Sequence, residues 1–214
     1  IEWSALDASL YQETLFLAGW IYGHLRAVVE AVRYYQLANA AHERSFTDAG
    51  ADKQRFLGPN EHARHRLDAQ FVASWPAPSV RAYQRDPVFF VGFPRSGTTL
   101  LENILDAHPG IATVQERPTI ESLIQELTGM PGGYPETLNH LSRADEHRLR
   151  ERYWRRRNDY VDDAQAQVII DKAPINSAYI PALYRLFPGA KIIFAVRHPA
   201  DADLSCWMQQ FRAN

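Results

Sequence analysis

The spacing of hydrophobic residues changes along the chain. Over residues 5–43, apolar residues recur at intervals of three and four, which predicts two helices with a break at Gly23. Residues 47–78 are more polar and hold several glycines and prolines, so they predict a linker with one short helix over residues 62–75. After Pro87, short apolar runs alternate with stretches of helical spacing. The hydrophobic pattern therefore changes from one typical of helices alone to one in which predicted strands and helices alternate.

The alternating part predicts an α/β fold. Runs typical of buried strands occupy residues 88–91, 111–114, 168–170 and 191–196. Helical spacing occupies residues 98–107, 120–127, 144–165, 179–187 and 200–211. Strands separated by helices are joined by right-handed crossovers, so we expect a parallel sheet flanked by helices. We expect a helical part at 1–45, a helical linker at 46–84 and an α/β domain at 85–214, C-terminally incomplete because no closing strand follows the last helix.

Composition narrows the class of protein. The 214 residues are 46% hydrophobic and 22% charged, which are globular values that argue against disorder. The formal net charge of -2 argues against nucleic acid or an anionic membrane as a partner. A single cysteine, Cys206, excludes an internal disulfide and favours a reducing, cytoplasmic location. No apolar run approaches the roughly 20 residues of a membrane span.

Residues 92–99, with the sequence G-F-P-R-S-G-T-T, lie between a predicted strand and a predicted helix. Their frame resembles the phosphate loop G-x-x-x-x-G-K-[ST]. Glycines let backbone N–H groups converge on an anion, and the helix N-terminus adds its positive dipole end. Thr98 stands where that loop has its lysine, and Arg95 supplies the cation instead. We therefore expect an anion of the 5′-phosphate type bound without a metal; the alternative is a glycine-rich turn that binds nothing.

Two blocks carry a family resemblance. Residues 94–99 resemble the 5′-phosphosulfate loop of sulfotransferases that use 3′-phosphoadenosine 5′-phosphosulfate (PAPS), in the arginine form of tyrosylprotein and bacterial tetratricopeptide-linked sulfotransferases. Residues 191–199 resemble the family's 3′-phosphate site, with Arg197 at a strand end and Ser205 eight residues later. The resemblance implies the phosphate-loop type of parallel sheet and a tetratricopeptide-like helix pair at the N-terminus.

The same resemblance implies the site residues. The expected ligands of the 5′-phosphosulfate are Arg95, Ser96, Gly97, Thr98 and Thr99, and those of the 3′-phosphate are Arg197 and Ser205. Lys172, in the segment D-K-A-P, matches the lysine that assists at the transferred group. Glu116 falls where tyrosylprotein sulfotransferases carry their catalytic glutamate, and it would take the acceptor proton. Arg95 is expected to act in catalysis as well as in binding. The neighbouring Glu102, Glu121 and Glu126 are expected to be solvated.

These residues predict a sulfotransferase that moves a sulfuryl group from PAPS to an acceptor hydroxyl by in-line displacement. The acceptor stays open among peptides, carbohydrates and small molecules, and the N-terminal helices are a candidate surface for a protein partner. One alternative is a small-molecule kinase with Asp171 recruited for magnesium, against which Thr98 argues. Another is a non-catalytic module that senses nucleotide. The arginines at 152, 155, 156 and 157 have Glu151 and Asp159 as neighbours in a chain of slightly negative net charge, so a solvated helix face is expected there rather than a nucleic-acid surface.

Overall fold

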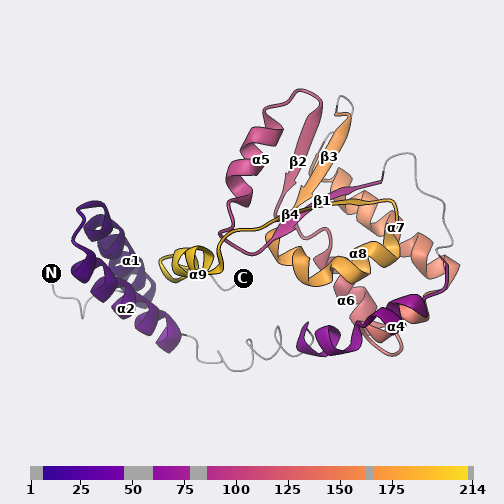
Figure 1. Cartoon of the computed structure of the whole chain (residues 1–214), viewed down its shortest axis with the longest axis horizontal. Helices are drawn as coiled ribbons and strands as arrows, with labels where there is room; N and C mark the ends of the chain where they lie inside the picture. The colour runs from indigo at the N-terminus through magenta and orange to yellow at the C-terminus, as the bar shows by residue number, and fades with distance from the viewer. Residues whose placement is uncertain (1–6, 46–59, 78–85, 162–165, 212–214) are drawn as a thin grey trace. The chain divides into compact units, whose positions relative to one another are not determined.

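The computed structural model describes residues 7–45, 60–77, 86–161 and 166–211 (Figure 1). The chain forms two compact units, one of residues 1–56 with 197–214 and the other of residues 57–196. The predicted domain limits fall at or within residues 46–59 and 78–85, outside the described residues, so they stay predictions. None of the helices in the described parts of the chain combines the length and apolarity that crossing a membrane requires.

The first unit contains a helical hairpin of α1 (Ala8–His24) and α2 (Val28–Ser45). Asp7 caps α1 by accepting a hydrogen bond from the Ser9 amide at 2.7 Å. The helices separate after His24 rather than at Gly23, which instead lies in the last turn of α1. The core of the hairpin is Leu15, Phe16, Ala31, Tyr35, Ala38 and Ala41.

The same unit includes α9 (Pro199–Trp207), which ends four residues earlier than predicted. The Trp207 ring lies 5.6 Å from the Tyr35 ring, centroid to centroid. The Asn39 side-chain amide donates to the Trp207 carbonyl at 2.9 Å. Helix α9 therefore packs on α2 within this unit, a pairing that joins the two ends of the chain. The likeness of the hairpin to a tetratricopeptide pair stays a prediction.

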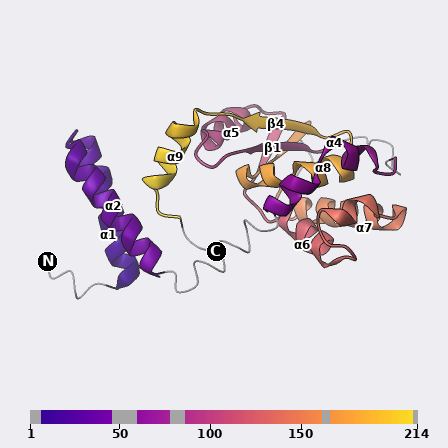
Figure 2. The ribbon, with the colours of Figure 1, turned by 60° about the horizontal axis from the view of Figure 1, so that its bottom comes forward.

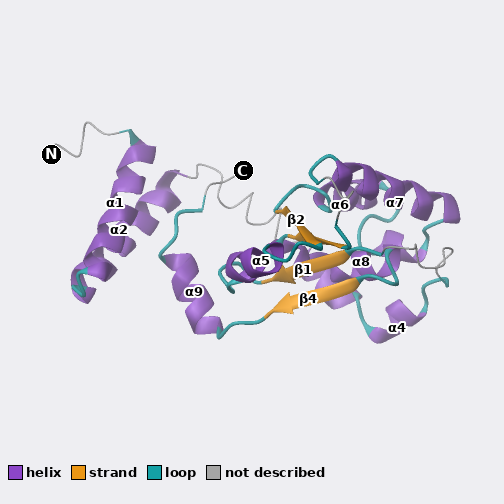
Figure 3. Ribbon diagram, turned by 90° about the horizontal axis from the view of Figure 1, so that it is seen from above, coloured by secondary structure: helices purple, strands orange, loops and turns teal. Residues whose placement is uncertain are grey.

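The second unit is built on a four-stranded sheet of β1 (Val88–Gly92), β2 (Ile111–Gln115), β3 (Val168–Lys172) and β4 (Lys191–Ala195). The strand order is β2-β3-β1-β4 and every neighbouring pair is parallel. Figure 3 shows the strands between the helices that connect them. The predicted α/β fold is confirmed, and each strand begins within one residue of its predicted start.

One face of the sheet is covered by α6 (Glu121–Gly129), α7 (Arg143–Asn158) and α8 (Ile180–Leu186), which Figure 2 shows gathered together. Phe89 and Val91 of β1 enter the core with residues of all three helices. Helix α5 (Thr98–Asp106) packs against β2 and β1. Because side chains alternate along a strand, neighbouring residues at the strand ends face opposite layers.

Three other predicted helices are split, shortened or preceded by a 3₁₀ segment. The predicted helix at 62–75 is split, because Asp68 caps α4 (Ala69–Ala73) by accepting from the Phe71 amide at 2.6 Å. A 3₁₀ segment (Pro174–Tyr179) precedes α8, where one helix starting at 179 was expected. Helix α7 ends at Asn158, and part of its predicted extension, residues 162–165, lies outside the described residues. A second 3₁₀ segment spans Glu136–Asn139.

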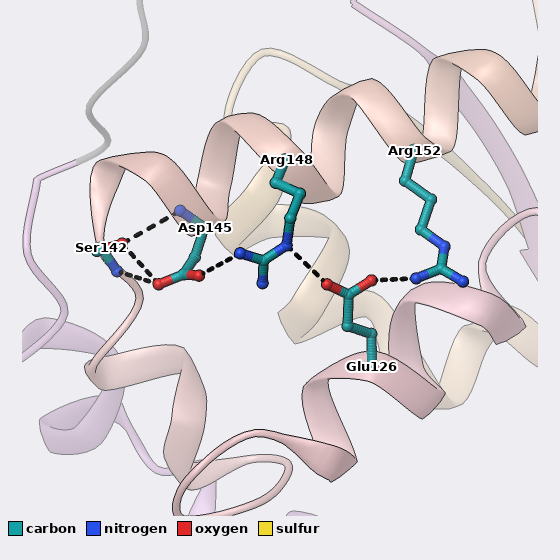
Figure 4. Close-up of polar contacts among 5 residues, drawn as sticks. All are labelled: Glu126, Ser142, Asp145, Arg148 and Arg152. Carbon is teal, nitrogen blue, oxygen red and sulfur yellow. Dashed lines mark hydrogen bonds and ion pairs between the residues drawn. The ribbon is translucent and has the colours of Figure 1, made fainter.

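Charged side chains join α6 to α7 at the surface (Figure 4). Ser142 and Asp145 form a reciprocal capping box at the start of α7. Glu126 accepts hydrogen bonds from Arg148, at 2.9 Å, and from Arg152. Burial alone raises the pKa of Glu126, but these two arginines hold it below its ordinary value. At Arg152, the helix face that was predicted to be solvated carries this ion-pair network. At Arg157 the prediction of a solvated side chain is wrong, because Arg157 is buried with its guanidinium 4.6 Å from the Trp154 ring centre.

Candidate active site

The loop of residues 92–99 connects the carboxyl end of β1 to α5. Gly97 is the N-cap of α5, with a left-handed φ of 85° that glycine adopts without a steric penalty. No side chain caps this helix, although the amides of a first helical turn have no acceptor within the helix. Ser96, Thr98 and Thr99 lie around this N-terminus. The geometry therefore presents backbone donors at a helix start, as an anion-binding loop requires.

Gly92 has a role that the sequence pattern did not identify. A Cβ on Gly92 would lie 2.8 Å from the carbonyl oxygen of Ala195, its partner in β4. The glycine is needed because the ends of β1 and β4 approach closely at this point. The first glycine of the loop therefore serves strand packing.

Lys172 is the centre of a charged cluster beside this loop. Its side chain, at the end of β3, is 0% exposed. Its ammonium nitrogen lies 2.7 Å from Oε1 of Glu116 and 3.0 Å from Oε2 of Glu102. Glu102 comes from α5 and Glu116 from the turn after β2. The structure thus brings together two residues that the sequence analysis selected, Lys172 and Glu116, across 56 positions of sequence.

Glu102 is the residue that the sequence analysis missed. It was expected to be solvated, but it is 3% exposed. Thr98, one helical turn earlier, is 4% exposed, so both residues lie on the inner face of α5. A carboxylate four positions after a loop threonine, opposite a strand that ends in lysine, is the signal that could have identified it. The charge of Glu102 by itself predicts a solvent-exposed side chain, because most carboxylates in proteins are exposed.

Glu116 is held in an uncommon backbone conformation. Its φ is 45°, and its amide donates to the Lys172 carbonyl at 2.7 Å. The side chain is 57% exposed, so one end of the cluster is open to solvent. Among the described non-glycine residues with positive φ are Arg26, Arg95 and Glu116, and two of these three belong to the candidate site. Such conformations are costly and collect at functional sites.

Asp171 fixes the same turn from the other face of the sheet. It is 1% exposed and accepts a hydrogen bond from the Thr119 hydroxyl at 2.7 Å. Burial raises the pKa of the Asp171 carboxyl to about 6, against the hydrogen bond from Thr119, which lowers it. The turn of residues 116–119 is therefore attached to β3 by the Lys172 contacts and by Asp171. A carboxyl buried in this way does not suit the magnesium role considered for a kinase.

The remaining predicted ligands are one arginine of the loop and two residues that follow β4. Arg95 is exposed within the loop, with a φ of 66°. Arg197 follows β4 and is exposed, and Ser205 is half-buried in α9. Both belong to the first unit, so their role at a 3′-phosphate stays a prediction. Among the described residues, no three His, Cys, Asp or Glu side chains gather so as to hold a metal ion.

A helix N-terminus at the carboxyl end of a parallel strand, with a lysine and two carboxylates nearby, is an arrangement that α/β proteins use at ligand sites. The family follows from comparison with known proteins. The model described as "Sulfotransferase family" matches residues 87–214. This match spans more than half of the chain, and the chain belongs to the sulfotransferase family.

Three curated relatives are similar to parts of the chain. An "Uncharacterized protein" from Aquifex aeolicus (strain VF5) is 32% identical over 136 residues, which are 59% of this chain and 17% of that protein. A "Putative protein-tyrosine sulfotransferase" from Caenorhabditis briggsae is 28% identical over 124 residues, 51% of this chain and 39% of that protein. The "Protein-tyrosine sulfotransferase" of Drosophila melanogaster is 28% identical over 134 residues, 55% of this chain and 25% of that protein. The chain spans less than half the length of each.

Proposed function

We propose that this protein transfers a sulfuryl group from PAPS to an acceptor hydroxyl. The observation that carries the proposal is the contact between Lys172 and Glu116 at 2.7 Å, beside a loop with an uncapped helix N-terminus. A cation and a base within reach of one anion-binding loop are the groups that such a transfer needs. Membership of the sulfotransferase family supports the type of reaction.

The loop would hold the 5′-phosphosulfate of the donor. The Ser96 amide donates to the Phe93 carbonyl at 3.2 Å, so the backbone donors for the donor anion would be the amides of Gly97, Thr98 and Thr99 at the start of α5. The helix start adds a positive dipole end, and the Arg95 guanidinium adds a full charge. Glycine at position 97 keeps the loop backbone open to a ligand, since a Cβ there has no neighbour within 4 Å. Arg197 and Ser205 would hold the 3′-phosphate, as the family resemblance implies.

The chemistry would be an in-line displacement at sulfur. The acceptor oxygen forms a bond to sulfur, the bond from sulfur to the 5′-phosphate oxygen breaks, and its electron pair stays on that oxygen. The Glu116 carboxylate takes the proton of the acceptor hydroxyl, for which its exposed position is suited. Lys172 and Arg95 stabilise the negative charge that grows on the leaving oxygen.

The acceptor would be a peptide, a carbohydrate or a small molecule with a hydroxyl group. Two relatives carry the words protein-tyrosine sulfotransferase in their names, so a tyrosine peptide is the first acceptor to test. A phenol also suits a carboxylate base, because it is more acidic than an alkyl hydroxyl.

Two measurements test the proposal. Calorimetry should show binding of adenosine 3′,5′-bisphosphate without magnesium, and weaker or no binding of magnesium ATP. A mixture of protein, labelled PAPS and tyrosine peptide should then yield labelled peptide. Binding of magnesium ATP alone would favour the kinase alternative, and binding of the bisphosphate without transfer to any of the three acceptor classes would favour a nucleotide-sensing module.

A further inference from the structure

The Lys172 ammonium lies between two carboxylates of very different exposure. Glu102 is 3% exposed and Glu116 is 57% exposed. The cluster therefore carries one positive and two negative charges, and its negative excess has one route to solvent, through Glu116. Lys172 itself is 0% exposed, so an incoming anion can reach its ammonium only after a neighbouring group moves, and the Glu116 carboxylate is the exposed group in contact with it.

A buried ammonium needs a counter-ion at every stage of a reaction, because an unpaired charge in the interior is strongly disfavoured. If Glu116 were its single partner, Lys172 would lose that partner whenever Glu116 turned to an acceptor hydroxyl. Glu102 removes this difficulty, since it is held on the inner face of α5 beside Thr98, away from solvent. The pairing of Lys172 with Glu102 is thus independent of where Glu116 points.

We propose that Glu102 is a positioning residue that holds the Lys172 ammonium in place while the Glu116 carboxylate exchanges for the sulfonate of the donor. No proton passes between Glu102 and Lys172, and no covalent bond forms at either. The exchange leaves Lys172 paired at all times and frees Glu116 for the acceptor proton. This inference rests on the proposed sulfuryl transfer.

The chain offers a matched control for a test. Glu146 of α7 and Arg185 of α8 are each 2% exposed, and Oε1 of Glu146 lies 2.5 Å from Nη2 of Arg185. The Arg185 Nε also donates to the Leu138 carbonyl at 3.0 Å. Glu146→Gln therefore takes the carboxylate charge away from a buried cation, as Glu102→Gln does. The difference is that Glu146 and Arg185 lie between α7 and α8, on the face of the sheet that α6, α7 and α8 cover.

The first experiment compares kinetics of the two variants. Glu102→Gln should lower kcat by about 10–100-fold, with little change in acceptor KM. This loss is smaller than the roughly 10²–10⁴-fold contribution of a group that itself transfers the proton. Glu146→Gln should leave kcat per folded molecule within about twofold while lowering the melting temperature. Equal kinetic effects of the two substitutions would overturn the proposal. If Glu102→Gln does not fold, Glu102→Asp keeps the charge with a shorter reach, and an unchanged kcat in that variant would overturn it too.

The second experiment tests whether Glu102 acts through Lys172. In a Lys172→Met background, adding Glu102→Gln should change kcat by less than about twofold, because residues that act as one unit are not additive. A residue with a separate structural role would lower kcat by the same factor in both backgrounds. Additive losses would therefore reject the positioning role.

The third experiment does not depend on activity. The chain has three lysines, at positions 53, 172 and 191, so lysine-labelled protein gives three side-chain ammonium signals in nuclear magnetic resonance. Glu102→Gln should shift the Lys172 signal and speed exchange of its protons with water, and Glu146→Gln should do neither. An unchanged signal in Glu102→Gln overturns the inference. A changed signal in a protein that transfers no sulfuryl group would instead show that the proposed function has failed while the anchoring contact stands.

Discussion

Two buried ion pairs of this molecule differ in what their surroundings allow. Glu146 and Arg185 join α7 to α8 by an ion pair, and the Arg185 Nε also donates to the Leu138 carbonyl. Lys172 has one buried partner, Glu102, and one exposed partner, Glu116. The cation of each cluster, Lys172 or Arg185, is buried. The two clusters therefore differ not in the burial of the cation but in the exposure of one partner, and the proposed function depends on that difference.

The two buried pairs also differ in the type of cation, which is an arginine in one and a lysine in the other. The planar guanidinium of Arg185 suits a fixed arrangement of acceptors, since its donors have fixed directions. The Lys172 ammonium is a compact charge with three rotatable donors, so it can exchange one anion for another without turning a plane. The chain uses lysine at three positions among its 23 basic residues, and one of them is the buried Lys172.

The largest expected effect comes from removing the exposed partner. Glu116→Gln should lower kcat by about 10²–10⁴-fold, because the acceptor proton loses its base. The affinity for adenosine 3′,5′-bisphosphate should be kept, since the loop amides and Arg95 are untouched. Calorimetry and turnover measured on one preparation check this pair of outcomes. Glu121→Gln, at an exposed carboxylate nearby, is the control, and an equal fall in affinity and turnover would reject the role of Glu116 as base.

Breaking the structural pair should affect stability instead. Glu146→Ala leaves the Arg185 guanidinium buried beside a lost partner, which should lower the free energy of unfolding by about 3–5 kcal/mol. Urea unfolding followed by fluorescence measures the loss. Turnover per folded molecule should stay at the wild-type value, and a fall in turnover of the remaining folded protein would contradict the division between the two clusters.

A third expected effect concerns the pH dependence at Asp171. The folded-state pKa of this carboxyl is about 6, raised by burial from 3.8, so the folded state binds its proton more tightly than the unfolded state. The stabilising contribution is complete below pH 3.8 and is lost as the pH rises through about 6. A shift of this size corresponds to about 3 kcal/mol.

Asp171→Asn should remove that dependence. Unfolding free energies at pH 4 and pH 7 should differ less in the variant than in the wild type, by up to about 3 kcal/mol. The asparagine carbonyl can still accept from the Thr119 hydroxyl, so the turn that holds Glu116 should persist. Asp201→Asn, at an exposed carboxylate, serves as the reference, and an identical pH slope in the wild type and in Asp171→Asn would show that burial does not raise this pKa.

The smallest expected effect is at the surface network of Figure 4. Glu126→Gln removes the acceptor shared by Arg148 and Arg152, whose side chains are 52% and 45% exposed. The loss should be about 0.5–1 kcal/mol of unfolding free energy, because solvent screens such pairs. Adding salt should shrink the difference between variant and wild type further. A loss as large as that of Glu146→Ala would mean that exposure does not weaken the pair.

The sequence predicted the sheet better than the cluster. Strands such as β1 are short apolar runs whose burial in a parallel sheet follows from their composition, so their positions were predictable. Lys172 and Glu116 were each selected through family resemblance, but their contact was not predicted, since no local pattern links residues 56 positions apart. The expectation that Glu102 is solvated is wrong because the inward face of α5 is set by packing against β1 and β2, which charge does not reveal.

The positive φ angles of Arg95 and Glu116 have a consequence for laboratory evolution. Glycine would relieve the steric cost at either position. A random library screened only for heat tolerance should therefore enrich glycine at these two codons, and the surviving clones would lack the guanidinium and the carboxylate proposed for chemistry. Improvement campaigns on this scaffold need a screen that scores product as well as melting.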